Sequence, residues 1–266
     1  MIKNLILLLS VIVTTMSGQT SVTPLKVEYN EYRIYMPSIV NLDLGTLLVN
    51  KEMAYYKSTL GIKQRNNAAV AEDAILINEE QEVLSEYVIN KKNNLLTEFL
   101  TEKRYLKKNY AVAEPIPAMT WILSKETKSF KNYICKKAST TFRGRVYNAW
   151  YTDKIPVSVG PWKFSGLPGL IMAIEDSKGI YKWDVRSITY PFKGEILSSP
   201  AELISNKKFK KLTLREYDDL RIAAMKLKVA TVKARNPNRI SGKVGLMLST
   251  EQDKEPYYPW RPQTEF

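Results

Sequence analysis

The chain contains no histidine and one cysteine, Cys135, among its 266 residues. Histidine is the usual general base near neutral pH and the commonest metal ligand, so its absence excludes Ser-His and Cys-His catalysis and histidine-based metal sites. A lone cysteine forms no disulfide within the chain and no thiolate-rich zinc or iron–sulfur site. We therefore expect Cys135 to be a small buried residue, and we expect no metal, no cofactor, no catalytic residue and no enzymatic activity. An enzyme would need carboxylates or a Tyr-Lys pair that converge in a pocket.

Long apolar runs are scarce as well. One lies at 5–13, between Lys3 and the small residues Thr15, Ser17 and Gly18, which is the pattern of a secretory signal. This run is shorter than the roughly 20 residues that cross a bilayer, and no later run is long enough. We expect a signal peptide at 1–18 and one exported domain at 19–266, located in the periplasm, at the outer membrane or outside the cell, with no transmembrane segment.

Basic residues exceed acidic ones, because 40 Lys and Arg face 27 Asp and Glu and give a net charge of +13. Such a charge favours contact with anionic surfaces such as lipid head groups or acidic glycans. The alternative is a basic face that contacts only solvent. No nucleic-acid-binding motif is present, so we expect no nucleic-acid partner.

Most of the chain shows strand patterns. In 180–188, apolar and polar residues alternate with Tyr181, Trp183 and Val185 on one side, which predicts a strand with one face in water. Turn residues at 176–179 join it to the apolar run 170–174 in a predicted hairpin. A second hairpin is predicted for 133–142 and 145–152 around Arg143-Gly144. Further strands are expected at 46–56, 83–89, 96–110 and 121–123, whereas 62–74 is expected to form a loop or short helix.

A helix is predicted to begin after Thr213, which forms a capping box with Glu216, and to stop before Pro237. We expect its apolar stripe to pack on the sheet, with a membrane-surface or partner helix as the alternative. The stripe consists of Leu214, Tyr217, Leu220, Ala224, Leu227 and Thr231.

The segment from Trp150 to Ile171 is rich in proline, glycine and aromatic residues, and its Pro168-Gly169 pair fits the centre of a type II turn. A loop of this length without secondary structure is often functional. It either closes the mouth of a ligand cavity or only closes one end of the sheet's core. The candidate ligand-binding residues are Trp150, Trp162, Phe164, Leu167, Pro168 and Leu170.

The motif at 166–171, GLPGLI, stands with other short motifs in a characteristic order between Trp121 and Val185. The chain resembles the GLPGLI family, exported proteins of the Bacteroidetes without an established activity. The residues that carry the resemblance are Trp121, 126–128 (ETK), 133–138 (YICKKA), 141–145 (TFRGR), 149–152 (AWYT), 155–156 (IP), 160–162 (GPW) and 164–171 (FSGLPGLI).

The resemblance implies an α+β fold, in which an antiparallel, strongly curved sheet forms a half-barrel like that of the periplasmic lipoprotein carriers, with a C-terminal helix packed on it. We expect a cell-envelope binding protein that holds a lipid or other apolar or amphipathic ligand in the concave side of this incomplete barrel. The alternative is a structural or assembly partner of an envelope or outer-membrane protein, with no ligand.

Overall fold

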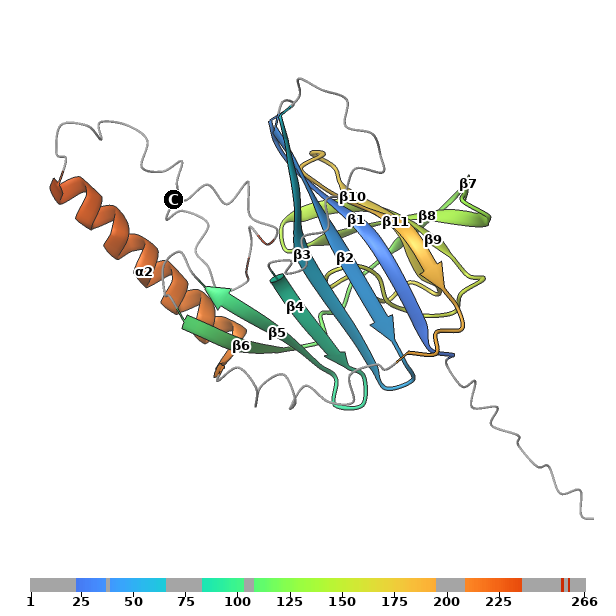
Figure 1. Ribbon diagram of the computed structural model, residues 1–266, viewed down its shortest axis with the longest axis horizontal. Coiled ribbons are helices and arrows are strands. Elements are labelled where there is room, and N and C mark those ends of the chain that lie inside the picture. The colour runs from blue at the N-terminus through green and yellow to red at the C-terminus, as the bar shows by residue number, and fades with distance from the viewer. Residues whose placement is uncertain are drawn as a thin grey trace, which may run out of the picture.

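A computed structural model describes residues 23–36, 39–65, 83–102, 108–194, 209–235, 255 and 258 of the chain. Its strands form one 12-stranded sheet with the order β12-β6-β5-β4-β3-β2-β1-β11-β10-β9-β8-β7 (Figure 1). The strands are β1 (Leu25–Met36), β2 (Ile39–Val49), β3 (Met53–Arg65), β4 (Val83–Asn90), β5 (Leu95–Glu102), β6 (Lys108–Pro115), β7 (Ile122–Phe130), β8 (Tyr133–Phe142), β9 (Arg145–Thr152), β10 (Leu170–Asp176), β11 (Tyr181–Thr189) and β12 (Lys210–Thr213).

The predicted half-barrel is wrong. The sheet is a single large open sheet whose two edge strands, β12 and β7, lie at opposite ends of the strand order. It is mixed, because β12 pairs in parallel with β6 while the other neighbours pair antiparallel. Hairpin patterns identify strands that pair locally, but the pairing of β1 with β11 joins strands more than 140 residues apart. That pairing merges two meanders into one sheet, and no local pattern in the sequence indicates it.

The hairpins predicted around Arg143-Gly144 and at 176–179 are confirmed by the β8–β9 and β10–β11 pairs. The predicted strand at 46–56 is instead a hairpin of β2 and β3, whose turn forms where the Asn50 side chain accepts hydrogen bonds from the amides of Glu52 and Met53. The predicted strand at 96–110 is likewise two strands, β5 and β6. At 62–74, β3 continues to Arg65, and the rest of this range lies outside the described residues.

The helix α2 (Leu214–Arg235) begins at the predicted capping box. The Thr213 amide donates to Glu216 Oε2 over 2.7 Å, and the Glu216 amide donates back to Thr213 Oγ1 over 3.2 Å. The prediction that its apolar stripe packs on the sheet is wrong for most of its length, because Leu220 is 37% and Leu227 69% exposed. Among the helix residues whose side chains are described, those at its start pack beside β6 and β12 at one edge of the sheet (Figure 1). No helix within the described ranges is long and apolar enough to span a bilayer.

The main core lies on one face of the sheet and is filled by the segment 153–169. Trp162 from this segment stacks on Trp183 of β11 with ring centroids 6.0 Å apart and packs edge-on against Phe142 of β8 at 5.6 Å. Its indole Nε1 donates to the Tyr87 hydroxyl of β4 over 3.1 Å. The segment therefore ties together strands from both halves of the sheet.

The predicted type II turn at Pro168-Gly169 is wrong, because Gly169 does not have the positive φ that this turn requires; in this loop φ is positive at Trp162 (54°) and Gly166 (95°). Gly169 serves a different purpose. A Cβ at this position would lie 2.0 Å from the backbone oxygen of Thr152, so only glycine permits this close approach of the loop to the end of β9.

We expect Phe164→Ala to lower the free energy of unfolding by about 3–5 kcal/mol, because Phe164 is fully buried against Trp162, Trp183 and Tyr147. Ile122→Ala is the matched control. Ile122 is 71% exposed on edge strand β7, so its loss should change stability by less than about 0.5 kcal/mol. Urea unfolding of both variants measures the difference, and equal effects would show that the segment is not part of the core.

Candidate functional site

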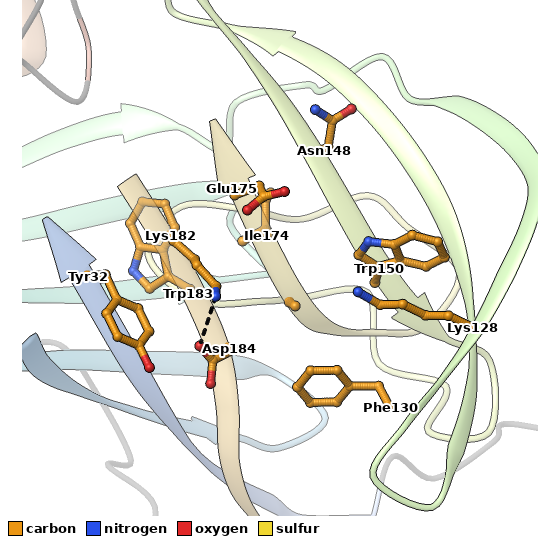
Figure 2. A pocket seen from close by; sticks show the side chains of 11 residues that line it. Tyr32, Lys128, Phe130, Asn148, Trp150, Ile174, Glu175, Lys182, Trp183 and Asp184 are labelled. Carbon is orange, nitrogen blue, oxygen red and sulfur yellow. Dashed lines mark ion pairs between the residues drawn. The ribbon is translucent and has the colours of Figure 1, made fainter. Parts of the chain in front are cut away.

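A pocket of about 380 Å³ is lined by residues of β1, β7, β9, β10 and β11 (Figure 2). Along β9 and β11 its polar and aromatic side chains alternate with residues of the main core, as Lys182 and Asp184 alternate with Trp183, so the pocket lies on the face of the sheet opposite the segment 153–169, and Trp183 and Ile174 border it from the core. The lining residues come from β1, β7, β9, β10 and β11 and are Tyr32, Lys128, Phe130, Asn148, Trp150, Ala173, Ile174, Glu175, Lys182, Trp183 and Asp184.

Strand register brings these side chains together as two rows of cross-strand neighbours. In one row the small Ala173 stands between Trp150 and Asp184, which leaves depth at the centre of the pocket. In the other, Glu175 stands between Asn148 and Lys182. The rows run Trp150, Ala173, Asp184 and Asn30, and Asn148, Glu175, Lys182 and Tyr32.

The end of the β7–β8 hairpin forms one wall of the pocket. Figure 2 shows Lys128 and Phe130 of β7 beside Trp150 of β9. The Lys128 ammonium lies 4.3 Å from the centroid of the Trp150 ring and 5.9 Å from that of Phe130. Cation–π attraction therefore helps to hold the hairpin end against the sheet.

One side of the pocket is internally paired. Lys182 Nζ lies 4.0 Å from Asp184 Oδ1 and 5.2 Å from the centroid of the Tyr32 ring. The other oxygen of Asp184, Oδ2, accepts a hydrogen bond of 3.1 Å from Asn30. These contacts fix the positions of both charged side chains.

Three further polar side chains of the pocket, those of Lys128, Asn148 and Glu175, make no ion pair with a described residue. Within the part of the chain that the structure describes, the side chains of Asn148 and Glu175 have no hydrogen-bond or ion-pair partner, and Lys128 has no carboxylate partner. Glu175 accepts hydrogen bonds, Lys128 donates them and Asn148 does both. The pocket therefore offers both signs of hydrogen-bonding group to a ligand.

Of the residues predicted to bind a ligand, the structure places only Trp150 in this pocket. Trp162, Phe164, Leu167 and Leu170 are buried in the core on the other face, and their role as ligand contacts stays a prediction. The sixth residue, Pro168, is exposed beside that core.

The remaining pocket residues were not predicted. The alternation at 180–188 predicts that its polar side faces solvent, and only the register of β9, β10 and β11 shows that Lys182 and Asp184 lie on the same side as Glu175 and Trp150.

A second polar cluster is buried around Lys163 of the loop, whose side chain is 1% exposed. Its Nζ lies 2.9 Å from a carboxylate oxygen of Glu255 and 3.2 Å from those of Glu98 and Glu114. Arg143 also contacts Glu114, and its Nε lies 3.7 Å from Glu255. This cluster links the loop to β5, β6, the β8–β9 turn and Glu255.

Burial and the neighbouring opposite charges shift the pKa values of this cluster in opposite directions. Burial opposes the charged form of Lys163, but the carboxylates of Glu255, Glu98 and Glu114 outweigh it and raise the lysine pKa well above its ordinary value. Burial raises the pKa of Glu114, and Lys163 and Arg143 offset this only in part. Burial also tends to raise the pKa of Glu255, but the positive charges of Lys163 and Arg143 outweigh burial and lower this pKa below its ordinary value.

We expect Lys163→Met to lower the free energy of unfolding by about 3–5 kcal/mol, because it removes the cation from three partly or fully buried carboxylates. Lys136→Met is the control. Its ion pair with Asp153 is solvent-exposed and screened, so the loss of stability should be much smaller than for Lys163→Met. Chemical denaturation at pH 7 compares the two, and similar small losses would contradict the role assigned to Lys163.

The contribution of Lys163 should also depend on pH in a defined direction. Its pKa is higher in the folded state than the ordinary 10.5, so its stabilisation is complete below 10.5 and is lost as the pH rises towards the folded-state pKa. The difference in stability between the wild type and Lys163→Met should therefore be constant from about pH 7 to 10 and shrink above that range. A difference that already shrinks between pH 7 and 9 would contradict a raised pKa.

Comparison with known proteins gives one family match. Residues 139–173 match a family model described as "Protein of unknown function (Porph_ging)". The matched stretch contains the motif 166–171 and the pocket residues Asn148, Trp150 and Ala173. No curated protein matches the chain.

Two solved structures of PNGF-II are similar to this chain. The structure in space group C2 is 16% identical in sequence and has a TM-score of 0.49. The match covers 74% of this chain and 32% of the PNGF-II chain. The structure in space group P21 is 17% identical in sequence and has a TM-score of 0.48. The match covers 74% of this chain and 33% of the PNGF-II chain. The chain thus spans about a third of the length of these proteins.

Proposed function

We propose that the chain is a non-catalytic binding domain that holds an amphipathic ligand in the pocket between β1, β7, β9, β10 and β11. One observation carries the proposal. Two polar side chains without a hydrogen-bond or ion-pair partner among the described residues, Asn148 and Glu175, and Lys128, which has no carboxylate partner there, lie in one pocket with the aromatic rings of Tyr32, Phe130 and Trp150. Small-molecule sites combine apolar walls with a few polar groups that fix orientation, and pockets of about 300–1,000 Å³ are typical for them.

The mixed lining favours a ligand with one apolar side and one hydrogen-bonding edge. A purely apolar molecule would remove Glu175 and Lys128 from water without replacing their hydrogen bonds, and that desolvation costs free energy. An amphipathic ligand covers the aromatic rings and satisfies the polar groups together.

The proposal includes export to the cell envelope and membership of the GLPGLI family. The signal-like pattern at 1–18 supports export, although these residues lie outside the described part of the structure. The family match at 139–173 supports the relationship, because this stretch contains the motif 166–171.

A structural or assembly role is the second candidate, and the edge strand β7 favours it. Ile122 and Leu123 on this strand are 71% and 59% exposed, and an open edge can pair with a strand of another protein. Crosslinking from a photoreactive residue at Ile122 in intact cells should then recover one defined envelope protein, and the additional change Leu123→Lys should abolish that crosslink while leaving the fold intact.

The binding function predicts where ligand-induced NMR shifts will occur. When the protein is screened against a library of small amphipathic molecules, binders should shift the indole resonance of Trp150 and the amides of Asn148 and Lys182, because these residues line the pocket. The buried indole of Trp162 serves as the internal control and should not move. If no library member shifts the pocket resonances, the proposed function is wrong.

A further inference from the structure

We propose that the ligand is a neutral saccharide, a ligand class that rests on the proposed function of the pocket. The chemistry of the lining distinguishes this class from other amphipathic molecules. A pyranose ring has apolar faces made of C–H groups and a rim of hydroxyl groups. The pocket presents a matching pair of surfaces, aromatic rings and hydrogen-bonding side chains.

The aromatic surfaces come from two sides of the pocket. Trp150 and Phe130 stand on one side and Tyr32 on the other, and all three are half-buried, so parts of their rings remain available to a ligand (Figure 2). An aromatic ring gives a large apolar contact with little loss of side-chain entropy, which suits the flat C–H face of a sugar.

The polar side chains of the pocket suit a ligand with several hydroxyl groups better than a ligand with a single charge. Each hydroxyl both donates and accepts, so Glu175 can accept from one, Lys128 can donate to another, and Asn148 can do either.

The ionisable side chains that line the pocket balance in charge, with Lys128 and Lys182 facing Glu175 and Asp184. A phosphate or carboxylate ligand would face Glu175, and an ammonium ligand would face Lys128, at a Coulombic cost that a neutral ligand avoids.

The strand register of the site also favours ligands whose hydroxyl groups have a fixed spacing. Asn148, Glu175 and Lys182 are consecutive cross-strand neighbours on β9, β10 and β11, and the pair of Lys182 and Asp184 is held by Tyr32 and Asn30. Residues on adjacent strands of the sheet keep a constant backbone spacing, which favours a ring with hydroxyls at fixed spacing over a flexible acyl chain.

The experiment is isothermal titration calorimetry of the whole protein with three neutral probes, N,N′,N″-triacetylchitotriose, cellotriose and maltotriose, and with lysophosphatidylcholine as a lipid-like probe. At least one trisaccharide should bind. Trp150→Ala should weaken that binding about tenfold through loss of the aromatic surface, and Glu175→Gln by a similar factor. Val146→Ala is the control, because Val146 lies on β9 on the same face but outside the pocket, and it should leave the affinity unchanged.

The outcomes separate the ligand class from the proposed function. Glu175 is an exposed residue, so Glu175→Gln stays folded even if Trp150→Ala does not, and circular dichroism checks both. Binding of lysophosphatidylcholine but of no trisaccharide, weakened by Trp150→Ala, would overturn the saccharide class and leave the binding function standing. Failure of all four probes to bind, or trisaccharide binding that neither pocket variant weakens, would overturn the saccharide proposal, and shifts in the NMR screen would then decide the binding function separately.

Discussion

The burial of Trp162, Lys163 and Phe164 on one face of the sheet is the constraint on which the rest of the structure depends. The two aromatic rings fill the space above β8, β9 and β11, while the ammonium between them in sequence reaches carboxylates on β5, β6 and the C-terminal segment. An open sheet needs a cover for its apolar face, and here the chain supplies it from a loop instead of a helix. The buried ion cluster then fixes the loop in one position, because displacement would leave Lys163 or its partners buried without a counter-charge.

As a result, one face of the sheet forms the core and the other face forms the pocket. The covered face is packed with the chain's own side chains, including most of the residues that the sequence suggests as ligand contacts. The other face carries the alternate residues of the same strands, and there the small Ala173 and the hairpin end at Phe130 leave an aromatic and polar pocket. Trp150 and Tyr151 are neighbours on β9 and point to opposite faces, so a single strand contributes to both the core and the pocket.

Local patterns in the sequence predicted local structure well. The turn at Arg143-Gly144, the capping box at Thr213 and the alternation around Trp183 depend on residues close in the chain, and the structure contains all three. The half-barrel was wrong because the overall shape depends on the pairing of β1 with β11, and the pocket was missed because it depends on register across four strands. The predicted stripe of α2 failed for a related reason, since periodicity shows which residues share a helix face but not how far the sheet extends beneath it.

The position of a bound ligand tests the division between the two faces most directly. A crystal structure of the protein with a trisaccharide selected by calorimetry would give that position. The account predicts electron density for the sugar between Trp150, Lys128 and Glu175, with the segment 153–169 in the same place as in the unbound protein. Density beneath a displaced Trp162, on the covered face of the sheet, would contradict the account.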